Sequence, residues 1–346
     1  MANDPFDGVV WHDASKLGLG GLGWCDEVRE NPYDRFPAAM RDQVAPKLWD
    51  LSTWAAGICV TFRTSARNLY VRWTLDEIDE RPVEAYQAAC ARSGMDCYGR
   101  DESENWRWVG TKEAWREPKC DGRLNNLPLD GIERDYRVYF PLMRRVLRAE
   151  IGACETILPS SKDRRLPIAY YGTSIVHGAV VSRPGMTHAA QLGRLLQSEV
   201  VNLGFCGRAW CEPEVAAALS RLQPALYVID VLPNNSAADL LQRLPVFLRI
   251  LRNARPDTPV LLVGDRMFGD AAFMPERRRD FAAKNAAQEQ AVQMLRDEGM
   301  EGLHLARHPD WFGADGEGST DGSHPNDLGA TRMAAALAPM VADYMS

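Results

Sequence analysis

From residue 166 onward, short apolar runs alternate with longer amphipathic segments, and this alternation constrains the fold more than any other feature. The apolar runs, such as PALYVIDVL at 224–232, lack the polar alternation of a half-exposed strand. Apolar strands that each lead into a helix are typical of a parallel sheet with helices on both faces. The expected strands are 166–171, 200–205, 224–232, 259–265 and 303–306, and the expected helices are 187–200, 212–222, 239–254, 275–299 and 325–345. The pattern predicts an α/β domain over residues 161–346 whose functional residues lie at the carboxyl ends of the strands.

Residues 1–160 show a different pattern, rich in Val, Thr, Tyr and Trp. Two alternating runs within 57–75 flank a turn-like TSARN, and further strand-like runs occupy 134–142 and 144–152. Long helical patterns are scarce here, so we expect an all-β sandwich of the jelly-roll type. The stretch ILPSSKDRRLP, at 157–167, separates the two patterns. A chain of 346 residues exceeds one compact core, which also predicts two domains.

Charge and composition exclude several classes of partner. The net charge of −7 disfavours nucleic acid, and no apolar run approaches the length of a membrane span. The N-terminus has neither a basic start nor an apolar h-region, so a cytoplasmic location is expected. The eight cysteines form no Cys-x-x-Cys pair and no metal-ligand spacing with histidine, so we expect reduced thiols, no metal and no cofactor. The oligomeric state stays open.

One glycine pattern imitates a dinucleotide-binding loop. Gly18, Gly20 and Gly23 have the spacing Gly-x-Gly-x-x-Gly. That motif binds pyrophosphate only where a strand turns into a helix. No strand-like run precedes these glycines and no clear helix follows them, so we expect a loop.

The segment YYGTSIVHG, at 170–178, places Ser174 just after the first expected parallel strand. A serine hydroxyl becomes a nucleophile only with a base within hydrogen-bond reach and a group that orients the base. Asp321 and His324, three residues apart in one loop after the last expected strand, can supply both. The carboxylate would hold the Nδ1 proton of the imidazole and leave Nε2 facing the serine. The alternative for Ser174 is a helix N-cap or turn hydroxyl.

Acyl transfer also needs hydrogen-bond donors for the developing oxyanion. The loop after the second expected strand contains Gly204 and Gly207, whose backbone N–H groups can approach closely. The loop after the third contains Asn234 and Asn235, whose side-chain amides can donate. The joint order of serine, glycine, asparagine and Asp/His along successive strands is more informative than any one of these residues.

With these blocks, residues 166–346 resemble the SGNH or GDSL-like hydrolases. The matching segments are Gly172-Thr173-Ser174, NLGFCG at 202–207, Pro233-Asn234 and DGSHP at 321–325. The resemblance implies a flavodoxin-like three-layer fold and metal-free ester hydrolysis, with Ser174 as nucleophile, His324 as base and Asp321 as its orienter. It also implies an oxyanion hole made by the N–H groups of Ser174 and Gly207 and the side chain of Asn234. The segment around Pro233-Asn234 lacks the Gly and Asp that are usual in this family. Asn235 therefore remains an alternative to Asn234 as the oxyanion donor.

The first half carries a second resemblance. SGMDCYGR, at 93–100, resembles the Gly-x-Asp-x-Tyr signature of a GxDLY-type β-sandwich that precedes some SGNH domains, and YDRFP at 33–37 and the stretch 48–73 also look like that domain. The combination implies a two-domain bacterial-type esterase that acts on acylated carbohydrates.

Together these features predict a serine esterase that removes small acyl groups, acetyl above all, from a hydroxylated substrate such as a carbohydrate. We expect Arg35 and Tyr33 to reach the substrate, and His177 to cap a helix. Sandwich tryptophans could stack on sugar rings, although core packing is the favoured explanation for most of them. Two alternatives stay open: an acyltransferase that passes the same acyl group to a natural-product acceptor, and a non-catalytic carbohydrate-binding protein.

Overall fold

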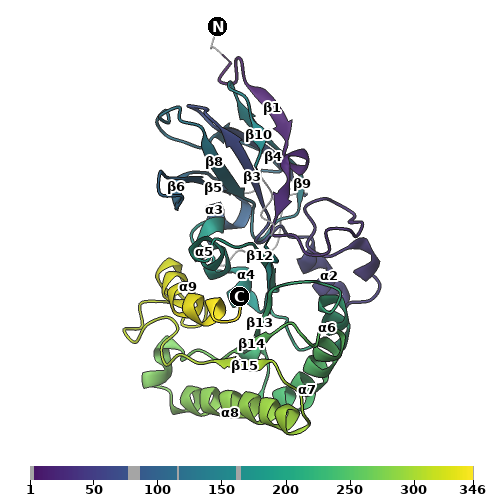
Figure 1. Cartoon of the computed structure of the whole chain (residues 1–346). Helices are drawn as coiled ribbons and strands as arrows, with labels where there is room; N and C mark the ends of the chain where they lie inside the picture. The colour runs from purple at the N-terminus through teal and green to yellow at the C-terminus, as the bar shows by residue number, and fades with distance from the viewer. Residues whose placement is uncertain (1–3, 77–85, 115–116, 161–164, 346) are drawn as a thin grey trace.

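The computed structural model describes residues 4–76, 86–114, 117–160 and 165–345. Two antiparallel sheets form the N-terminal part, shown at the top of Figure 1. One sheet has the spatial order β1 (Val10–Asp13), β9 (Val146–Ala153), β4 (Tyr70–Leu75), β7 (Lys119–Arg123). The other has the order β10 (Leu158–Pro159), β3 (Cys59–Thr64), β8 (Arg134–Tyr139), β5 (Met95–Arg100), β6 (Trp106–Lys112), with β2 (Leu19–Gly20) also paired to β3. Alternate residues of both sheets, such as Phe62 and Trp73, point into one shared core, which gives the predicted sandwich.

The C-terminal part is built on a five-stranded parallel sheet. Its spatial order is β12 (Val200–Gly204), β11 (Ile168–Gly172), β13 (Leu226–Asp230), β14 (Val260–Val263), β15 (Leu303–Ala306). The first strand in sequence thus lies between the second and the third, which is the flavodoxin-like order. Such an order leaves a crevice at the carboxyl end of β11, where the chain turns to opposite sides of the sheet.

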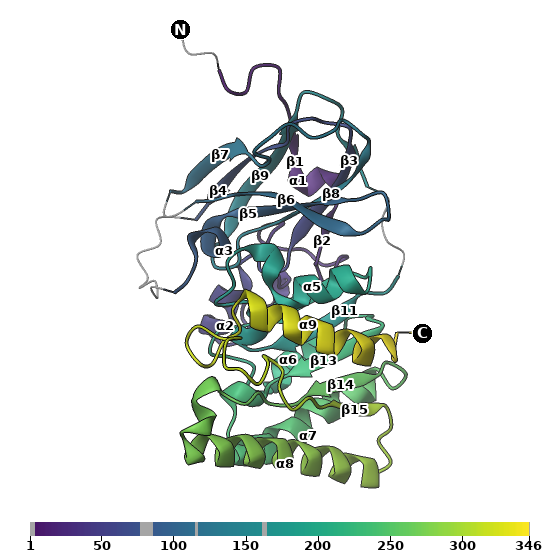
Figure 2. The same cartoon turned by 90° about the vertical axis from the view of Figure 1, so that its left-hand side faces the viewer.

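Successive residues of these buried strands point to opposite faces, and each face has its own helices. Tyr171 and Leu203 pack with α6 (Pro213–Leu219), α7 (Ala237–Ala254) and α8 (Pro275–Asp297). Tyr170 and Val200 pack toward α5 (His188–Leu195) and α9 (Asp327–Ala342). Figure 2 shows α5 and α9 on the near side of the sheet. These three layers and the preceding sandwich confirm the predicted fold class.

Short elements complete the chain, several of them not predicted. They are α1 (Ala14–Leu17), η1 (Ala38–Met40), α2 (Pro46–Ser52), α3 (Ala89–Ser93), α4 (Ser174–His177), η2 (Pro184–Met186), η3 (Leu232–Asn234) and η4 (Gly269–Ala272). The glycine pattern at 18–23, expected to be a loop, includes the two-residue strand β2, and turns and bends follow Gly23.

The segment 24–51 packs with the helices of the parallel sheet although it precedes most of the sandwich in sequence. Trp24, Phe36 and Leu48 belong to the same core as Phe205, and the Phe36 and Phe205 rings lie 5.1 Å apart. Figure 1 shows α2 beside α6. A division of the chain near residue 160 stays a prediction, since residues 161–164 lie outside the described part. The packing shows that this segment crosses from the sandwich into the core of the C-terminal part.

Asp96, the acidic residue of the Gly-x-Asp-x-Tyr signature, joins the two parts. Its Oδ1 accepts hydrogen bonds from Trp108 Nε1 and Thr111 Oγ1, both at 3.0 Å within the sandwich. Its Oδ2 accepts from Arg183 at 2.7 Å and from the backbone N–H of Gly185 at 2.9 Å, both in the loop before α5. Burial raises the pKa of Asp96, and these donors oppose that effect. The signature therefore marks a contact between the sandwich and the C-terminal part.

We expect Asp96→Ala to destabilise the fold by roughly 3 kcal/mol, because it leaves a partly buried guanidinium and a buried N–H without their acceptor. Urea unfolding followed by circular dichroism measures the shift in midpoint. Glu133→Ala is the control, since Glu133 pairs with Arg63 only at the exposed surface, at 3.9 Å, and its loss should leave the midpoint nearly unchanged. Equal midpoints for Asp96→Ala and the control would contradict this assignment.

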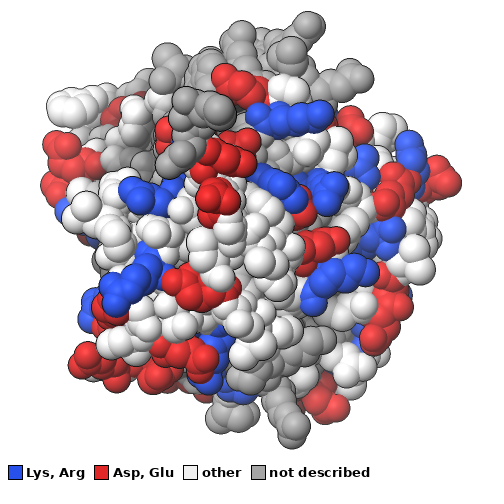
Figure 3. Space-filling view, turned by 90° about the horizontal axis from the view of Figure 1, so that it is seen from above, with Lys and Arg blue, Asp and Glu red and all other residues white. Residues whose placement is uncertain are grey.

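Charged side chains of both signs intermingle on the sandwich end of the molecule, as Figure 3 shows. Within the described ranges, no helix has the length and apolar character needed to cross a bilayer.

Candidate active site

Ser174 is the first residue of α4, directly after β11. The side chain of Thr173 caps this helix by accepting from the N–H of Ile175 at 3.3 Å. The helix can sit this close to the sheet only because two glycines leave room. A Cβ on Gly172 would collide with the side chain of Val176, and one on Gly204 would collide with the backbone nitrogen of His177, both in α4. The sequence thus folds so that the serine emerges at the end of the central strand.

The structure brings Ser174, His324 and Asp321 into one hydrogen-bonded chain. Ser174 Oγ lies 2.7 Å from His324 Nε2, and His324 Nδ1 lies 2.6 Å from Asp321 Oδ2. The imidazole side chain is about one quarter exposed and the Asp321 side chain less so. This arrangement suits proton transfer from the hydroxyl to an oriented imidazole.

The loop that carries the histidine is fixed by the other oxygen of the same carboxylate. Asp321 Oδ1 accepts from the backbone N–H groups of Ser323 at 2.9 Å and His324 at 2.8 Å. Ser319 Oγ donates to the carbonyl of His324 at 2.6 Å, and Asn326 then caps α9. Burial raises the pKa of Asp321, but the hydrogen bonds from His324 and Ser323 outweigh it and hold the pKa below its usual range. Asp321 is therefore ionised at neutral pH.

Two loops at the neighbouring strand ends offer donors. Gly207 is exposed, has φ of +67°, and has no atom within 4 Å of an ideal Cβ position, so its backbone faces open space. Asn234 is half-buried, and its Nδ2 donates to the carbonyl of Arg208 at 2.8 Å, which leaves its second amide hydrogen for another acceptor. Both amide hydrogens of Asn235 are engaged, by the carbonyls of Ala209 and Val231. This geometry favours Asn234 over Asn235 as an oxyanion donor.

Arg35 and Tyr33 do not lie where a substrate could reach them, which corrects their predicted role in substrate binding. Arg35 is only 2% exposed, and its guanidinium donates to backbone carbonyls that include Gly204 at 2.6 Å and Trp54 at 2.9 Å. Tyr33 is 1% exposed, with its hydroxyl 3.4 Å from the carbonyl of Ala149. Desolvation lowers the pKa of Arg35 to about 9. Arg35 instead ties segment 24–51 to the end of β12.

His177 also differs from its expected role as a helix cap. It is the last residue of α4 and fully buried, and its Nδ1 lies 3.1 Å from the carbonyl oxygen of Gly204. The ring therefore ties the helix to β12. Burial is the main cause that lowers the pKa of His177 to about 3, and it does the same for His188, whose Nε2 lies 3.1 Å from Tyr170 Oη.

These two histidines predict a loss of stability in mild acid. In the unfolded chain each has an ordinary pKa of about 6.5 and gains a proton as the pH falls, whereas the folded protein takes up these protons only near pH 3. The free energy of unfolding should thus drop by roughly 2 kcal/mol per histidine between pH 7 and pH 5. Urea unfolding at both pH values measures this drop. His188→Gln should reduce it by about one histidine's share, and an unchanged drop would contradict the assignment.

The loop after β12 also presents side chains that the sequence did not single out. Arg208 stacks on the ring of Trp210, 4.4 Å from its centroid, and Trp210 is 38% exposed. Ala209 and Cys211, in the same loop, both adopt positive φ values, +70° and +58°. Of the sandwich tryptophans, Trp108 is half exposed and carries Arg183 over its ring. No spacing in the sequence distinguishes Arg208 and Trp210 from ordinary loop residues.

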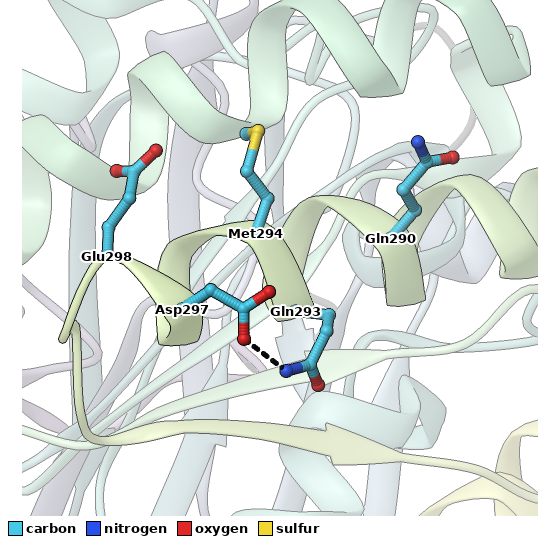
Figure 4. Close-up of a pocket in the computed structure, with 5 residues that line it drawn as sticks. All are labelled: Gln290, Gln293, Met294, Asp297 and Glu298. Atoms are coloured by element: carbon cyan, nitrogen blue, oxygen red, sulfur yellow. Dashed lines mark hydrogen bonds between the residues drawn. The ribbon is translucent and has the colours of Figure 1, made fainter.

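A separate hollow lies on the outer side of α8, lined by Gln290, Gln293, Met294, Asp297 and Glu298 (Figure 4). All five come from the C-terminal end of this one helix, near the amino end of β15, whereas Ser174 lies at the carboxyl edge of the sheet. Gln293 Nε2 donates to Asp297 Oδ1 at 2.7 Å. Within the described ranges, no cluster of three His, Cys, Asp or Glu residues could hold a metal ion.

Comparisons with known proteins identify structures of similar fold. The chain is similar over 97% of its length to a structure described as a GDSL-like lipase from Bacteroides ovatus, with 26% identity, 98% of that chain covered and a TM-score of 0.89. A salicylyl-acyltransferase from a tetracycline biosynthetic pathway shares the fold, with 18% identity, a TM-score of 0.71, and 99% and 96% of the two chains covered. A family two carbohydrate esterase from Clostridium thermocellum in complex with cellohexaose does so with 12% identity, a TM-score of 0.57, and 83% and 92% covered.

The comparison with curated proteins gives no match. Residues 9–157 match the model of the N-terminus of SGNH-hydrolase-type esterases. Residues 165–342, more than half of the chain, match the model of the GDSL-like lipase/acylhydrolase family. The chain is therefore a carboxylic ester hydrolase and belongs to the GDSL-like lipase/acylhydrolase family.

Proposed function

We propose that this protein is a serine esterase that removes acetyl or similarly small acyl groups from a hydroxylated substrate such as a carbohydrate. The observation that carries the proposal is the hydrogen-bonded chain from Ser174 Oγ through the His324 ring to Asp321, with distances of 2.7 and 2.6 Å. Two of the three residues lie on a loop that is fixed by its own hydrogen bonds, which preorganises the base.

In the proposed cycle, Ser174 Oγ attacks the ester carbonyl while His324 Nε2 takes the hydroxyl proton. The N–H groups of Ser174 and Gly207 and the amide of Asn234 donate to the oxyanion that forms. His324 returns the proton to the departing alcohol, and an acyl group stays on Ser174. A water molecule then loses a proton to His324 and attacks the acyl-enzyme, which releases the carboxylic acid and restores the serine.

The carbohydrate part of the proposal is supported by the exposed Trp210 ring, which lies on the same loop as Gly207. Aromatic faces offer apolar stacking surface to sugar rings. The carbohydrate esterase that binds cellohexaose shares this fold. The tryptophan that we propose to contact the sugar is therefore Trp210 of the C-terminal part, rather than a tryptophan of the sandwich.

Two measurements test the esterase. The purified protein should hydrolyse p-nitrophenyl acetate and a panel of acetylated sugars. A fluorophosphonate probe should label it once per chain, with the modified peptide containing Ser174. A folded protein that neither turns over acetyl esters nor accepts the probe would refute the proposal. Labelling would also argue against the non-catalytic carbohydrate-binding alternative.

Replacing Asn234 with alanine should lower kcat by about 10² to 10³-fold with little change in KM, because the lost donor acts only on the developing oxyanion. Steady-state kinetics on p-nitrophenyl acetate measure the effect. Asn235→Ala serves for comparison, because the Asn235 amide bonds backbone carbonyls. Asn235→Ala should lower the free energy of unfolding and leave kcat of the folded fraction unchanged. The reverse pattern would assign the oxyanion role to Asn235.

An acyltransferase is the second candidate, favoured by the fold shared with the salicylyl-acyltransferase over 99% of this chain. The same acyl-enzyme would then be attacked by an acceptor alcohol in place of water. Mass spectrometry of products formed with and without added polyols distinguishes the two. Free acid as the dominant product in both cases supports the esterase.

A further inference from the structure

A narrow pocket opens beside Ser174, between the asparagine loop and the histidine loop. Its walls include Ile175, which follows the serine, Ser323, which precedes the catalytic histidine, and Pro233, which precedes Asn234. Phe268 and Phe312 add apolar surface, and the walls lie close together in this structure. A substrate group that extends from the reacting ester toward Pro233 and Ser323 would meet these walls.

One carboxylate interrupts the apolar walls. Asp265 lies in the loop after β14 and lines the pocket, yet it is only 3% exposed. Its backbone N–H donates to Asn285 Oδ1 at 3.1 Å, and its Oδ1 accepts from the N–H of Arg266 at 3.0 Å, so the side chain is held in place. Among the described residues, none donates a hydrogen bond to its Oδ2. A buried carboxylate oxygen in this state is costly unless a donor reaches it.

The surrounding cations do not supply that donor. The guanidinium of Arg266 is turned to Asp230 and forms a two-pronged pair with it. The nearest ammonium is Lys284 Nζ, which lies 3.9 Å from Asp265 Oδ2 but only 2.8 Å from Asp280. This cluster therefore holds three carboxylates, those of Asp230, Asp265 and Asp280, and two cations, with an excess of one negative charge. This excess of negative charge favours the approach of a hydrogen-bond donor to Asp265 Oδ2.

We propose that Asp265 is a specificity residue that accepts a hydrogen bond from a hydroxyl or amino group of the substrate within this pocket. The proposal rests on the proposed function, since it places that group next to the ester attacked by Ser174. The apolar walls accept the carbon skeleton, and the single acceptor selects skeletons that carry a donor at this position. A site built to accept a hydrogen bond rejects the isostere that lacks the donor.

The donor can belong to either half of the ester, and matched substrates distinguish the halves. In the acyl series, phenyl 3-hydroxybutanoate is compared with phenyl 3-methylbutanoate. In the alcohol series, 2-hydroxypropyl acetate is compared with 2-methylpropyl acetate. Within each pair a hydroxyl replaces a methyl group of similar size, so the ratio of kcat/KM values reports recognition of the donor. We expect the wild type to favour the hydroxylated ester by about 10- to 100-fold in one of the two series.

Three variants assign that preference to Asp265. Asp265→Leu removes the acceptor at similar size and should bring the ratio to about one or invert it. Asp265→Asn keeps an acceptor oxygen and should retain part of the preference. Glu289→Gln removes a carboxylate that pairs with Arg307 at 3.2 Å, outside both the pocket and the Asp265 cluster, and should keep the wild-type ratio. Circular dichroism and melting temperatures establish that each variant is folded.

A binding measurement keeps this test independent of turnover. Calorimetric titration of Ser174→Ala with the same esters should show tighter binding of the hydroxylated member, and adding Asp265→Leu should abolish the difference. If the wild type hydrolyses no ester while this difference persists, the esterase fails and the Asp265 site stands. A wild type with no preference in either series, or a preference that survives in Asp265→Leu, overturns the assignment of Asp265.

Discussion

Replacing Ser174 with alanine is expected to lower kcat on p-nitrophenyl acetate by on the order of 10⁵-fold, to the level supported by the oxyanion donors alone. The only atom lost is Oγ, which lies 2.7 Å from His324 Nε2, so the fold should be intact. His324→Ala should cost a similar factor, because the serine then has no base. The double variant should be no worse than either single one, since the two residues act as a unit.

Thr173→Val is the matched control for Ser174→Ala. It removes the neighbouring hydroxyl that caps α4, and it should lower stability rather than the chemical step. Equal kcat values for wild type and Ser174→Ala would show that Ser174 only terminates the strand. Additive losses in the double variant would show that serine and histidine do not act together.

Asp321→Asn should lower kcat by about 10³ to 10⁴-fold while the protein stays folded. In the wild type the carboxylate accepts the Nδ1–H of His324, which leaves Nε2 as the acceptor for the serine proton. An asparagine that turns its NH₂ group to the ring would instead donate to Nδ1, and Nε2 would carry the proton. The imidazole would then be in the wrong tautomer for a base.

The control for this change is Asp315→Asn in the preceding loop. Asp315 pairs with Arg332 at 2.7 Å on the exposed surface and has no contact with the imidazole. Its kcat should match that of the wild type. A loss below tenfold for Asp321→Asn would mean that backbone contacts alone orient His324.

The sequence patterns predict the parallel sheet well because its strands are buried on both faces. Runs such as 224–232 have no other favourable environment, and each leads to a segment with helical spacing. The order of residues at the strand ends likewise brings Ser174, Asp321 and His324 together, because parallel strands end at one edge. The short helix α4 was missed, since its four residues carry no periodicity.

Local sequence patterns do not predict the role of a residue when that role depends on contacts with distant parts of the chain. Arg35 reads as a charged residue near an aromatic, and only the fold shows that carbonyls from β12 surround it. Asp265 reads as a polar residue that ends a strand. Its importance comes from Asn285 and Lys284 on α8 and from a pocket whose other walls lie in three further segments. These residues lie too far apart in the sequence for any local pattern to relate them.

The shared core of segment 24–51 has a consequence for the synthesis of the protein. Trp24, Phe36 and Leu48 leave the ribosome about 150 residues before β12, against which they pack. At ordinary translation rates of about 5–20 residues per second, these apolar side chains wait roughly 8 to 30 s for their partners. The nascent chain therefore exposes a hydrophobic segment after the sandwich sequence is complete. Chaperones that bind such segments should engage the chain between residue 51 and the end of the parallel sheet.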